Sequence, residues 1–441
     1  MFDFLFYTAA LLVTLGVLVT FHEWGHFYAA RKLGVKVLRF SVGFGKPLWK
    51  RTGKDGVEYV IAGIPLGGYV KMLDEREGNV DSADQSMAFN RQPIWKRNII
   101  VAAGPVANFV LAIIVFWIMF MMGTYVVKPI TGEPPAQSIA AEAGITANHR
   151  IMAVDGQSVA GWKDVTWALV ERLGEAGEIE LQLESTETGM QKQAVLNISN
   201  WQVDDRRPDV LQSLGLQPQM QLTPVVYNVS SGSAADQAGM QKGDRITQLN
   251  DKPVTSFRDI SDFMQSVKST DRISVTVQRD NESLELAAFP QLVDNRYLLG
   301  ISAYPIVEQQ SAGVWKGFQL ALDETWRVIA LTATMFKKLV LGEVSTKSLG
   351  GPISIAEGAG SSARGGLVYF LSFLGMISVN LGLINLLPVP VLDGGHLLFN
   401  LMETIKGKPL SEKAQEFGMK IGIVMVLGLM SIAIFNDIAR L

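Results

Sequence analysis

Residues 4–29 read FLFYTAALLVTLGVLVTFHEWGHFYA, and this stretch decides the class of fold. Its first part, residues 4–19, is almost wholly apolar. An apolar run of about 20 residues is long enough to cross a bilayer as a helix. Two histidines and a glutamate follow at its end, and ionisable groups at membrane depth are costly and usually functional. The stretch therefore predicts a membrane helix that carries a functional polar site.

Composition narrows the chemistry that such a site can use. The chain has 441 residues, of which 48% are hydrophobic, so it is too long for one compact domain and too apolar for an ordinary soluble chain. It contains no cysteine, which excludes disulfides and thiol catalysis. Any histidine-based metal site must draw on four residues: His22, His26, His149 and His396.

Four segments are apolar and long enough to span a bilayer, at about 4–28, 99–127, 366–392 and 417–436. Residues 31–98 carry 13 Lys and Arg against 7 Asp and Glu, whereas residues 128–365 carry 21 against 28. The positive-inside rule then places 31–98 in the cytoplasm and the long middle region outside, with both termini outside. Asp3 is the only early charge, so the first span is predicted to be a retained helix and not a signal peptide.

The middle region contains a repeat at an offset of 95 residues. SIAAEAGITANHRIMAVDGQSVAGWKDV from Ser138 aligns with SAADQAGMQKGDRITQLNDKPVTSFRDI from Ser233. Each copy predicts a short helix ending at glycine, two strands around a tight turn, and a second helix. The pattern resembles PDZ domains, which bind an extended peptide as an added strand. It predicts two tandem α+β PDZ-like domains that sense or gate peptides, and it makes His149 a turn residue.

His22, Glu23 and His26 form the motif H-E-x-x-H. On a helix, residues four apart share one face, so both imidazoles can reach a single Zn²⁺. Glu23 can take a proton from a metal-bound water. The alternative, a pair of surface histidines on an ordinary helix, fits poorly with the apolar flanks.

A zinc protease needs a third protein ligand and an open fourth position. VNLGLINLLPVPVLDGGHLLF, residues 379–399, offers Asp393 at the end of the third apolar segment. Pro388 and Pro390 cannot sustain a regular helix, so the backbone there should loosen and line a cavity. His396 is the competing ligand, and it could equally support the metal site from outside the ligand set.

The combination of H-E-x-x-H in the first span with N-x-x-P-x-P-x-L-D-G in a later one resembles the site-2 protease family of intramembrane zinc metalloproteases. With the PDZ-like repeats, the resemblance covers essentially the whole chain. It implies zinc bound by His22, His26 and Asp393, with Glu23 as the general base. It also implies that Asn385 holds the substrate, although an interhelical hydrogen bond is the alternative role for this amide.

A transmembrane substrate must unwind before its peptide bonds can be cut, and the enzyme has to replace the broken backbone hydrogen bonds. GVEYVIAGIPLGGYVKM, residues 56–72, predicts two short strands around Pro65. The resemblance makes it a membrane-reentrant β-hairpin that offers an edge strand, with SVGFGKP, residues 41–47, as a neighbouring loop. Soluble cytoplasmic turns are the alternative. The predicted substrate-binding residues besides Asn385 are Gly43, Gly45, Gly63, Ile64, Pro65 and Gly67.

Three further segments complete the prediction. Residues 82–97 predict an interfacial helix with Trp95 as an anchor, and 317–342 an amphipathic helix near the membrane surface. Asn108, in the second span, predicts one structural interhelical hydrogen bond.

The fold class is thus a multidomain membrane protein: an α-helical bundle of four spans with a reentrant β-hairpin, plus two tandem α+β PDZ-like domains outside. The predicted order is a first transmembrane helix (1–30), a cytoplasmic-side segment (31–98), a second transmembrane helix (99–127), PDZ-like domains (128–222 and 223–308), a membrane-proximal helical segment (309–365), a third transmembrane helix with LDGGH (366–396), a cytoplasmic loop (397–416), and a fourth transmembrane helix with its tail (417–441).

The predicted function is intramembrane cleavage of single-span membrane proteins near the cytoplasmic end of their helix. From the resemblance we expect a bacterial inner-membrane enzyme with periplasmic PDZ-like domains. Its expected substrates are a trimmed anti-sigma factor and leftover signal peptides, with membrane lipid but no nucleic acid as a further partner. One alternative is a membrane adaptor with a structural metal and peptide-binding PDZ domains. A transporter is a weaker alternative, because its polar residues would be spread along several spans.

Overall fold

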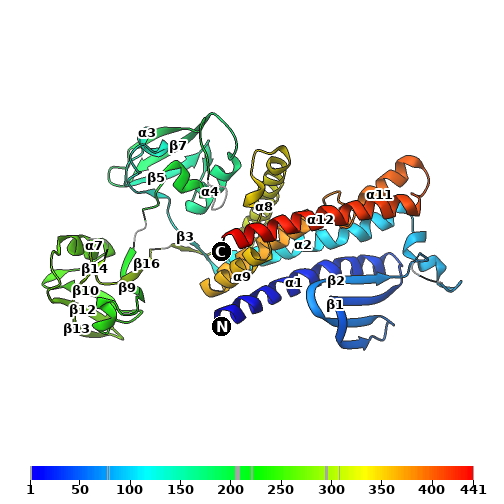
Figure 1. Ribbon diagram of the computed structural model, residues 1–441, viewed down its shortest axis with the longest axis horizontal. Helices are drawn as coiled ribbons and strands as arrows, with labels where there is room; N and C mark the ends of the chain where they lie inside the picture. Colours follow the sequence, from blue (N-terminus) through cyan, green and yellow to red (C-terminus); the bar gives the residue numbers. More distant parts are fainter. Residues whose placement is uncertain are drawn as a thin grey trace.

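The computed structural model describes residues 2–76, 78, 80–203, 209–219, 222–293, 296–306 and 308–440. In this part of the chain, four helices are long and apolar enough to cross a membrane, which confirms the predicted number of spans. They are α1 (Phe2–Lys32), α2 (Ile94–Met122), α10 (Leu367–Asn385) and α12 (Glu412–Arg440). Figure 1 shows them running alongside one another, with the two β-rich domains beyond one end of the bundle.

Helix α2 lies at the centre of the bundle and packs against both α1 and α10. The approach of α1 to α2 is close, because a Cβ on Gly25 would lie 2.2 Å from the carbonyl oxygen of Ala103. Small residues let membrane helices come together in this way. Helix α9 (Pro352–Gly365) packs against α1, α10 and α12. Asp437 of α12 accepts hydrogen bonds from the backbone amides of Gly351 and Ile353, both at 2.9 Å, and so caps the start of α9.

Strands β1 (Val37–Thr52) and β2 (Glu58–Met72) form an antiparallel sheet in which each strand bends back on itself. The first half of β1 pairs on one side with residues 68–72 and on the other with residues 58–61. The second half of β1 then pairs with residues 58–62. The prediction of a hairpin contained in residues 56–72 was therefore wrong. Residues 41–47 are not a separate loop either, since they form the bend of β1, where Gly43 has φ +91°.

The third apolar helix ends at Asn385, earlier than predicted. Leu386 to Leu392 form a chain of tight turns around Pro388 and Pro390, as expected for loosened backbone. Asp393 then opens a separate helix, α11 (Asp393–Lys406), which packs against α2. The prediction that 366–396 is one helix and 397–416 a loop was wrong, because the proline pair ends α10 and the chain begins a new helix after it.

Residues 124–310 contain two sheets with the repeated order of elements that the sequence predicted. The first sheet has the order β4-β5-β7-β8 with β6 on β5, and the second has the order β13-β12-β10-β9-β16 with β11 on β10. The first copy comprises β4 (Ile130–Thr131), α3 (Ile139–Glu142), β5 (His149–Val154), β6 (Gln157–Ser158), α4 (Trp162–Glu171), β7 (Glu178–Ser185), β8 (Gln191–Asn197) and α5 (Val210–Leu214). The second comprises β9 (Leu222–Val229), α6 (Ala234–Gln237), β10 (Arg245–Leu249), β11 (Lys252–Pro253), α7 (Phe257–Ser266), β12 (Ile273–Arg279), β13 (Glu282–Ala288), β14 (Gln291–Val293), β15 (Arg296–Leu298) and β16 (Ile301–Pro305).

Each of these two sheet domains has its own apolar core. They are joined to the bundle by a two-stranded ribbon, in which β3 (Thr124–Val126) pairs with β17 (Glu308–Gln310). The ribbon lies between the bundle and the two sheet domains (Figure 1).

Helix α8 (Val314–Leu341) joins the first sheet domain to the bundle. Its Ala321 and Val328 are buried in a cluster with residues of α2 and α10. On the same buried face, Glu324 accepts a hydrogen bond from Lys163 at 2.6 Å, so that α8 also contacts α4. The predicted amphipathic helix is present, but it packs against two membrane helices. The short 3-10 helix η3 (Thr346–Ser348) follows it.

The predicted interfacial helix over residues 82–97 was wrong. This segment contains two short 3-10 helices, η1 (Gln85–Met87) and η2 (Phe89–Arg91). Trp95 belongs instead to the first turn of α2, which follows Pro93 directly.

Candidate metal centre

His22 and His26 lie on the face of α1 that is turned toward α2, and each residue is only 9% exposed. Their Nε2 atoms are 3.2 Å apart, as the spacing of four residues along a helix allows. Two imidazole nitrogens that face each other at this distance cannot both carry a proton. With the proton of each neutral ring on Nδ1, both Nε2 atoms offer a lone pair to one point in space.

Asp393 completes this group from the start of α11. Its Oδ2 lies 3.2 Å from Nε2 of His22, and its Oδ1 lies 3.5 Å from Nε2 of His26. Zinc ligands at the usual bond lengths of 2.0–2.1 Å are about 3.4 Å apart in a tetrahedron. Oδ2 of Asp393 is also buried without a hydrogen-bond partner. The donor types, their spacing and this unpaired oxygen all fit a zinc ion.

Glycine on α2 makes room for the two rings. A Cβ on Gly104 would lie 2.3 Å from Nε2 of His26 and 2.9 Å from Cε1 of His22. Real side chains essentially never approach so closely. The backbone of α2 therefore forms one wall of the group, and only glycine fits there.

Two further glycines hold Asp393 in place. A Cβ on Gly394 would lie 2.2 Å from the carbonyl oxygen of Leu387, and one on Gly395 would lie 2.4 Å from that of Val389. The proline-containing turns thus fold directly against the first turn of α11. This explains locally why the aspartate is followed by two glycines.

The far end of α11 is fixed to α2 by a largely buried polar cluster. Arg97 donates to Oδ1 of Asn400 at 3.2 Å and to Oε1 of Glu403 at 2.7 Å. The exposed fractions of the Arg97 and Glu403 side chains are only 12% and 17%. Because α2 also packs on α1, this ion pair fixes the helix that carries Asp393 relative to the helix that carries the histidines.

Glu23 is as buried as the histidines. It lies against the antiparallel sheet of β1 and β2, which is called the curled sheet from here on. A Cβ on Gly68 would be 2.9 Å from Cγ of Glu23. Gly68 belongs to the second half of β2, which pairs on one side only, with the first half of β1. An edge of β2 that pairs with no other strand in the described part of the chain therefore passes directly beside this carboxylate.

The remaining predicted site residues are distributed along the fold as follows. Asn385 is the last residue of α10, just before the proline turns, and it is half-buried. A Cβ on Gly67 would meet the ring of Phe44. Gly43, Gly45 and Ile64 contact one another at the bend of the curled sheet, close to Gly63 in β2. The backbone of Pro65 lies in β2, but its side chain lies outside the described part of the structure.

The other two histidines do not join the group. Among the described residues, the histidines and acidic groups that could hold one metal ion together are His22, His26 and Asp393. His396 lies one turn after Asp393 and is exposed, with its ring against Phe399. His149 is in the first sheet domain, where it is the first residue of β5 and not the turn residue that the repeat predicted, and its Nδ1 contacts the carbonyl oxygen of Ala147 at 3.0 Å.

Sequence reasoning missed the contribution of α2 to this centre. His26 places Nδ1 2.9 Å from the carbonyl oxygen of Ile100, and His22 places Nδ1 3.1 Å from the side-chain amide of Asn108. The stretch GPVAN, residues 104–108, carried the available signal, since it holds both Gly104 and Asn108. From the sequence this stretch indicated close helix packing and one interhelical hydrogen bond of Asn108; the interhelical contact is present, but its partner, His22, was not predicted.

One protein family and several known proteins match this chain over most or all of its length. The profile of peptidase family M50 matches residues 10–429. The chain is 42% identical to the regulator of sigma-E protease RseP of Escherichia coli and 39% identical to the regulator of sigma E protease of Haemophilus influenzae, in each case over 100% of both chains. It is also 41% identical, over 100% of both chains, to a protein of Vibrio cholerae named as a zinc metalloprotease. The chain therefore belongs to peptidase family M50, the site-2 protease family, and is a zinc metalloprotease of the bacterial inner membrane.

Proposed function

We propose that this protein is an intramembrane endopeptidase that cleaves the transmembrane segment of single-span membrane proteins. In this proposal His22, His26 and Asp393 hold the zinc ion. The observation that carries it is the group itself: three ligand residues from α1 and α11, in which the two Nε2 atoms are 3.2 Å apart and each lies 3.2 or 3.5 Å from one carboxylate oxygen of Asp393. They converge beside an apolar helix and a free strand edge.

The chemistry assigned to each side chain follows from its position. When bound, zinc supplies a Lewis acid that makes hydroxide available near neutral pH. The Glu23 carboxylate, next to the first ligand, accepts the proton of the attacking water and passes it to the leaving amine. The buried wall formed by α2 keeps other water away from the histidines. Asp393, held at the start of α11, balances the positive charge at the centre.

Substrate presentation is assigned to the curled sheet. Among the described residues, residues 68–70 pair with β1 on one side only, next to Glu23, so an unwound substrate could add there as a further strand. This would replace the backbone hydrogen bonds lost on unwinding, each of which is costly to leave unmade in lipid. The half-buried amide of Asn385, which can both donate and accept, would hold the substrate from the other side. Gly43, Gly45, Gly63, Ile64 and Pro65 would shape the sheet that receives it.

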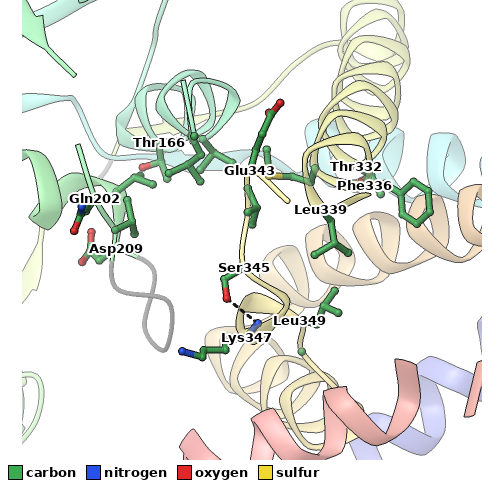
Figure 2. A pocket seen from close by; sticks show the side chains of 18 of the residues that line it. Thr166, Gln202, Asp209, Thr332, Phe336, Leu339, Glu343, Ser345, Lys347 and Leu349 are labelled. Carbon is green, nitrogen blue, oxygen red and sulfur yellow. Dashed lines mark hydrogen bonds between the residues drawn. The ribbon is translucent and has the colours of Figure 1, made fainter. Parts of the chain in front are cut away.

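Access is assigned to the two sheet domains, which we propose are PDZ-like, periplasmic and selective for size. A cavity of about 1120 Å³ lies between the first sheet domain and helices α8 and α10. Figure 2 shows Thr166 and Asp209 on the domain side and Thr332 and Leu339 on the helix side. Its lining includes Ile384, the neighbour of Asn385. A short outer stump would fit in this space, whereas a folded outer domain would not.

The substrates that match this proposal are an anti-sigma factor already trimmed on its outer side, and remnant signal peptides. Deleting residues 128–306 should leave the β3–β17 ribbon and allow cleavage of an untrimmed substrate. If the deletion variant cleaves trimmed substrate and still rejects the untrimmed one, size selection by the sheet domains is wrong.

The catalytic assignment is tested by Glu23→Gln in a cleavage assay with a single-span substrate in liposomes. Loss of a general base should lower turnover by about 10²- to 10⁴-fold. The zinc content should stay at the wild-type value, because Glu23 is not in the ligand group. Asp262→Asn, an exposed carboxylate of the second sheet domain, serves as the matched control and should cleave normally. Wild-type turnover in Glu23→Gln would refute the mechanism.

The adaptor alternative has little support. It requires a closed structural site with four protein ligands, whereas the group in the described residues offers three. Membership in a peptidase family also favours a catalytic centre.

A further inference from the structure

The side-chain amide of Asn108 is buried where three membrane helices meet. The residue is 0% exposed and lies on α2. Its Nδ2 is 3.1 Å from Nδ1 of His22 on α1. Its backbone carbonyl accepts a hydrogen bond from Ser378 Oγ on α10, at 2.8 Å. Its side-chain Oδ1, in contrast, is buried with no hydrogen-bond partner.

This orientation of the amide does not suit a metal-binding histidine. Nε2 of His22 is the atom that faces His26 and Asp393. A neutral imidazole that binds a metal through Nε2 carries its proton on Nδ1 and needs an acceptor there. The amide nitrogen of Asn108 also donates, so two donors would face each other across 3.1 Å. Only the amide oxygen can accept that proton.

Oxygen and nitrogen of an amide have nearly the same shape, and which is which is settled by the hydrogen bonds around them. A half turn of the Asn108 amide exchanges the two atoms. It places the unpaired Oδ1 next to Nδ1 of His22 and needs no movement of the helices.

We propose that Asn108 is a positioning residue, whose Oδ1 accepts the Nδ1 proton of His22 and so fixes Nε2 toward the zinc ion. The inference rests on the proposed function, since it takes His22 as a ligand. His26 receives the same support from the backbone carbonyl of Ile100 at 2.9 Å. The two histidines thus differ, because the partner of His22 is a side chain that can be replaced.

The test is the zinc affinity of the full-length protein in detergent, measured by competition with a metallochromic chelator. Asn108→Leu keeps the number and branching of the side-chain heavy atoms but has no acceptor, and zinc should bind about 10- to 100-fold more weakly. Asn108→Asp keeps an acceptor at the same place, and zinc should bind as tightly as in the wild type or more tightly. Ser378→Ala is the matched control, because it removes a hydrogen bond to Asn108 without touching the amide. Its zinc affinity should be unchanged.

The ranking of the variants by zinc affinity decides whether Asn108 has this role. Wild-type affinity in Asn108→Leu, or an affinity of Asn108→Asp more than tenfold below the wild type, would overturn the inference. The Asp variant alone is decisive if the Leu variant does not fold, since an amide that acts as a donor cannot be replaced by a carboxylate. His22→Ala separates the two levels of the argument. If it keeps wild-type affinity, the ligand assignment fails as well. If it loses zinc while Asn108→Leu does not, only the role of Asn108 fails.

Discussion

Replacing Gly104 by alanine should displace the proposed metal ligands His22 and His26 without changing the chemistry of either. The added Cβ would lie 2.3 Å from Nε2 of His26 and 2.9 Å from Cε1 of His22, whereas ordinary contact begins at 3.4 Å. The ring of His26 cannot swing freely, because its Nδ1 is held at 2.9 Å from the carbonyl oxygen of Ile100. Helix α2 cannot retreat easily either, since Gly25 of α1 lies against Ala103.

The distance from the added Cβ to Nε2 of His26 is thus about 1 Å shorter than ordinary contact, and a misplacement of that size typically costs about 100-fold in catalysis. We expect cleavage of a single-span substrate and affinity for zinc to fall together by about that factor. Gly16→Ala is the control, because it lies on α1, where nothing approaches its added Cβ within 4 Å. Alanine there should be neutral or stabilise the helix by about 0.5–1 kcal/mol. Wild-type zinc affinity in Gly104→Ala would refute the close wall formed by α2.

Three further outcomes follow from contacts outside the ligand group. Arg97→Met leaves the largely buried Glu403 without its partner and should destabilise the protein by about 3–5 kcal/mol. This would be measured as a lower melting temperature in detergent, and an unchanged melting temperature would show that the ion pair does not hold α11. Lys338→Met removes three donor contacts from α8 to the first sheet domain and should speed hydrogen exchange at the end of α4, with zinc content unchanged; equal exchange rates would argue against this attachment. Burial would raise the pKa of Asp244, but hydrogen bonds from Arg279 and a backbone amide outweigh it and hold the pKa below its ordinary value. This contribution to stability is present above about pH 4 and lost as the pH falls through the lowered pKa, so Asp244→Asn should flatten the acid loss of protection in β10 and β12; a parallel acid profile would contradict it.

The sequence was most informative where a single helix or a repeated pattern carries the signal. The H-E-x-x-H spacing placed His22 and His26 on one face, and the alternation of apolar segments gave four spans. Asp393 was a candidate because prolines precede it and it supplies a carboxylate at the end of an apolar segment, but the choice of Asp393 over His396 rested on the resemblance to the site-2 protease family. The offset of 95 residues between the two copies gave the repeated order of helices and strands.

The remaining features depend on contacts between residues distant in the chain, which no local pattern contains. Strand β1 has enough apolar residues for one long strand, and only its pairing with both halves of β2 reveals the fold-back. Pro388 and Pro390 predicted the end of α10, but the packing of Gly394 and Gly395 against the preceding carbonyls, where α11 begins, is visible only in the structure. Asn108 looks like any small polar residue in a membrane helix until α1 places His22 beside it.

The β3–β17 ribbon means that the segment carrying both sheet domains leaves and re-enters the bundle at nearly the same point. A Cβ on Gly123, at the end of α2, would lie 3.0 Å from the side-chain amide of Gln309, next to the start of α8. Segments whose ends lie together are tolerated as insertions, because the host structure does not have to stretch to accommodate them. The contact of α2 with α8 can therefore form whatever the length of the chain segment that connects the two helices. The segment between them can be lengthened, shortened or duplicated while the helices of the candidate metal centre keep their spacing, and such a duplication would leave a repeat like the one at an offset of 95 residues.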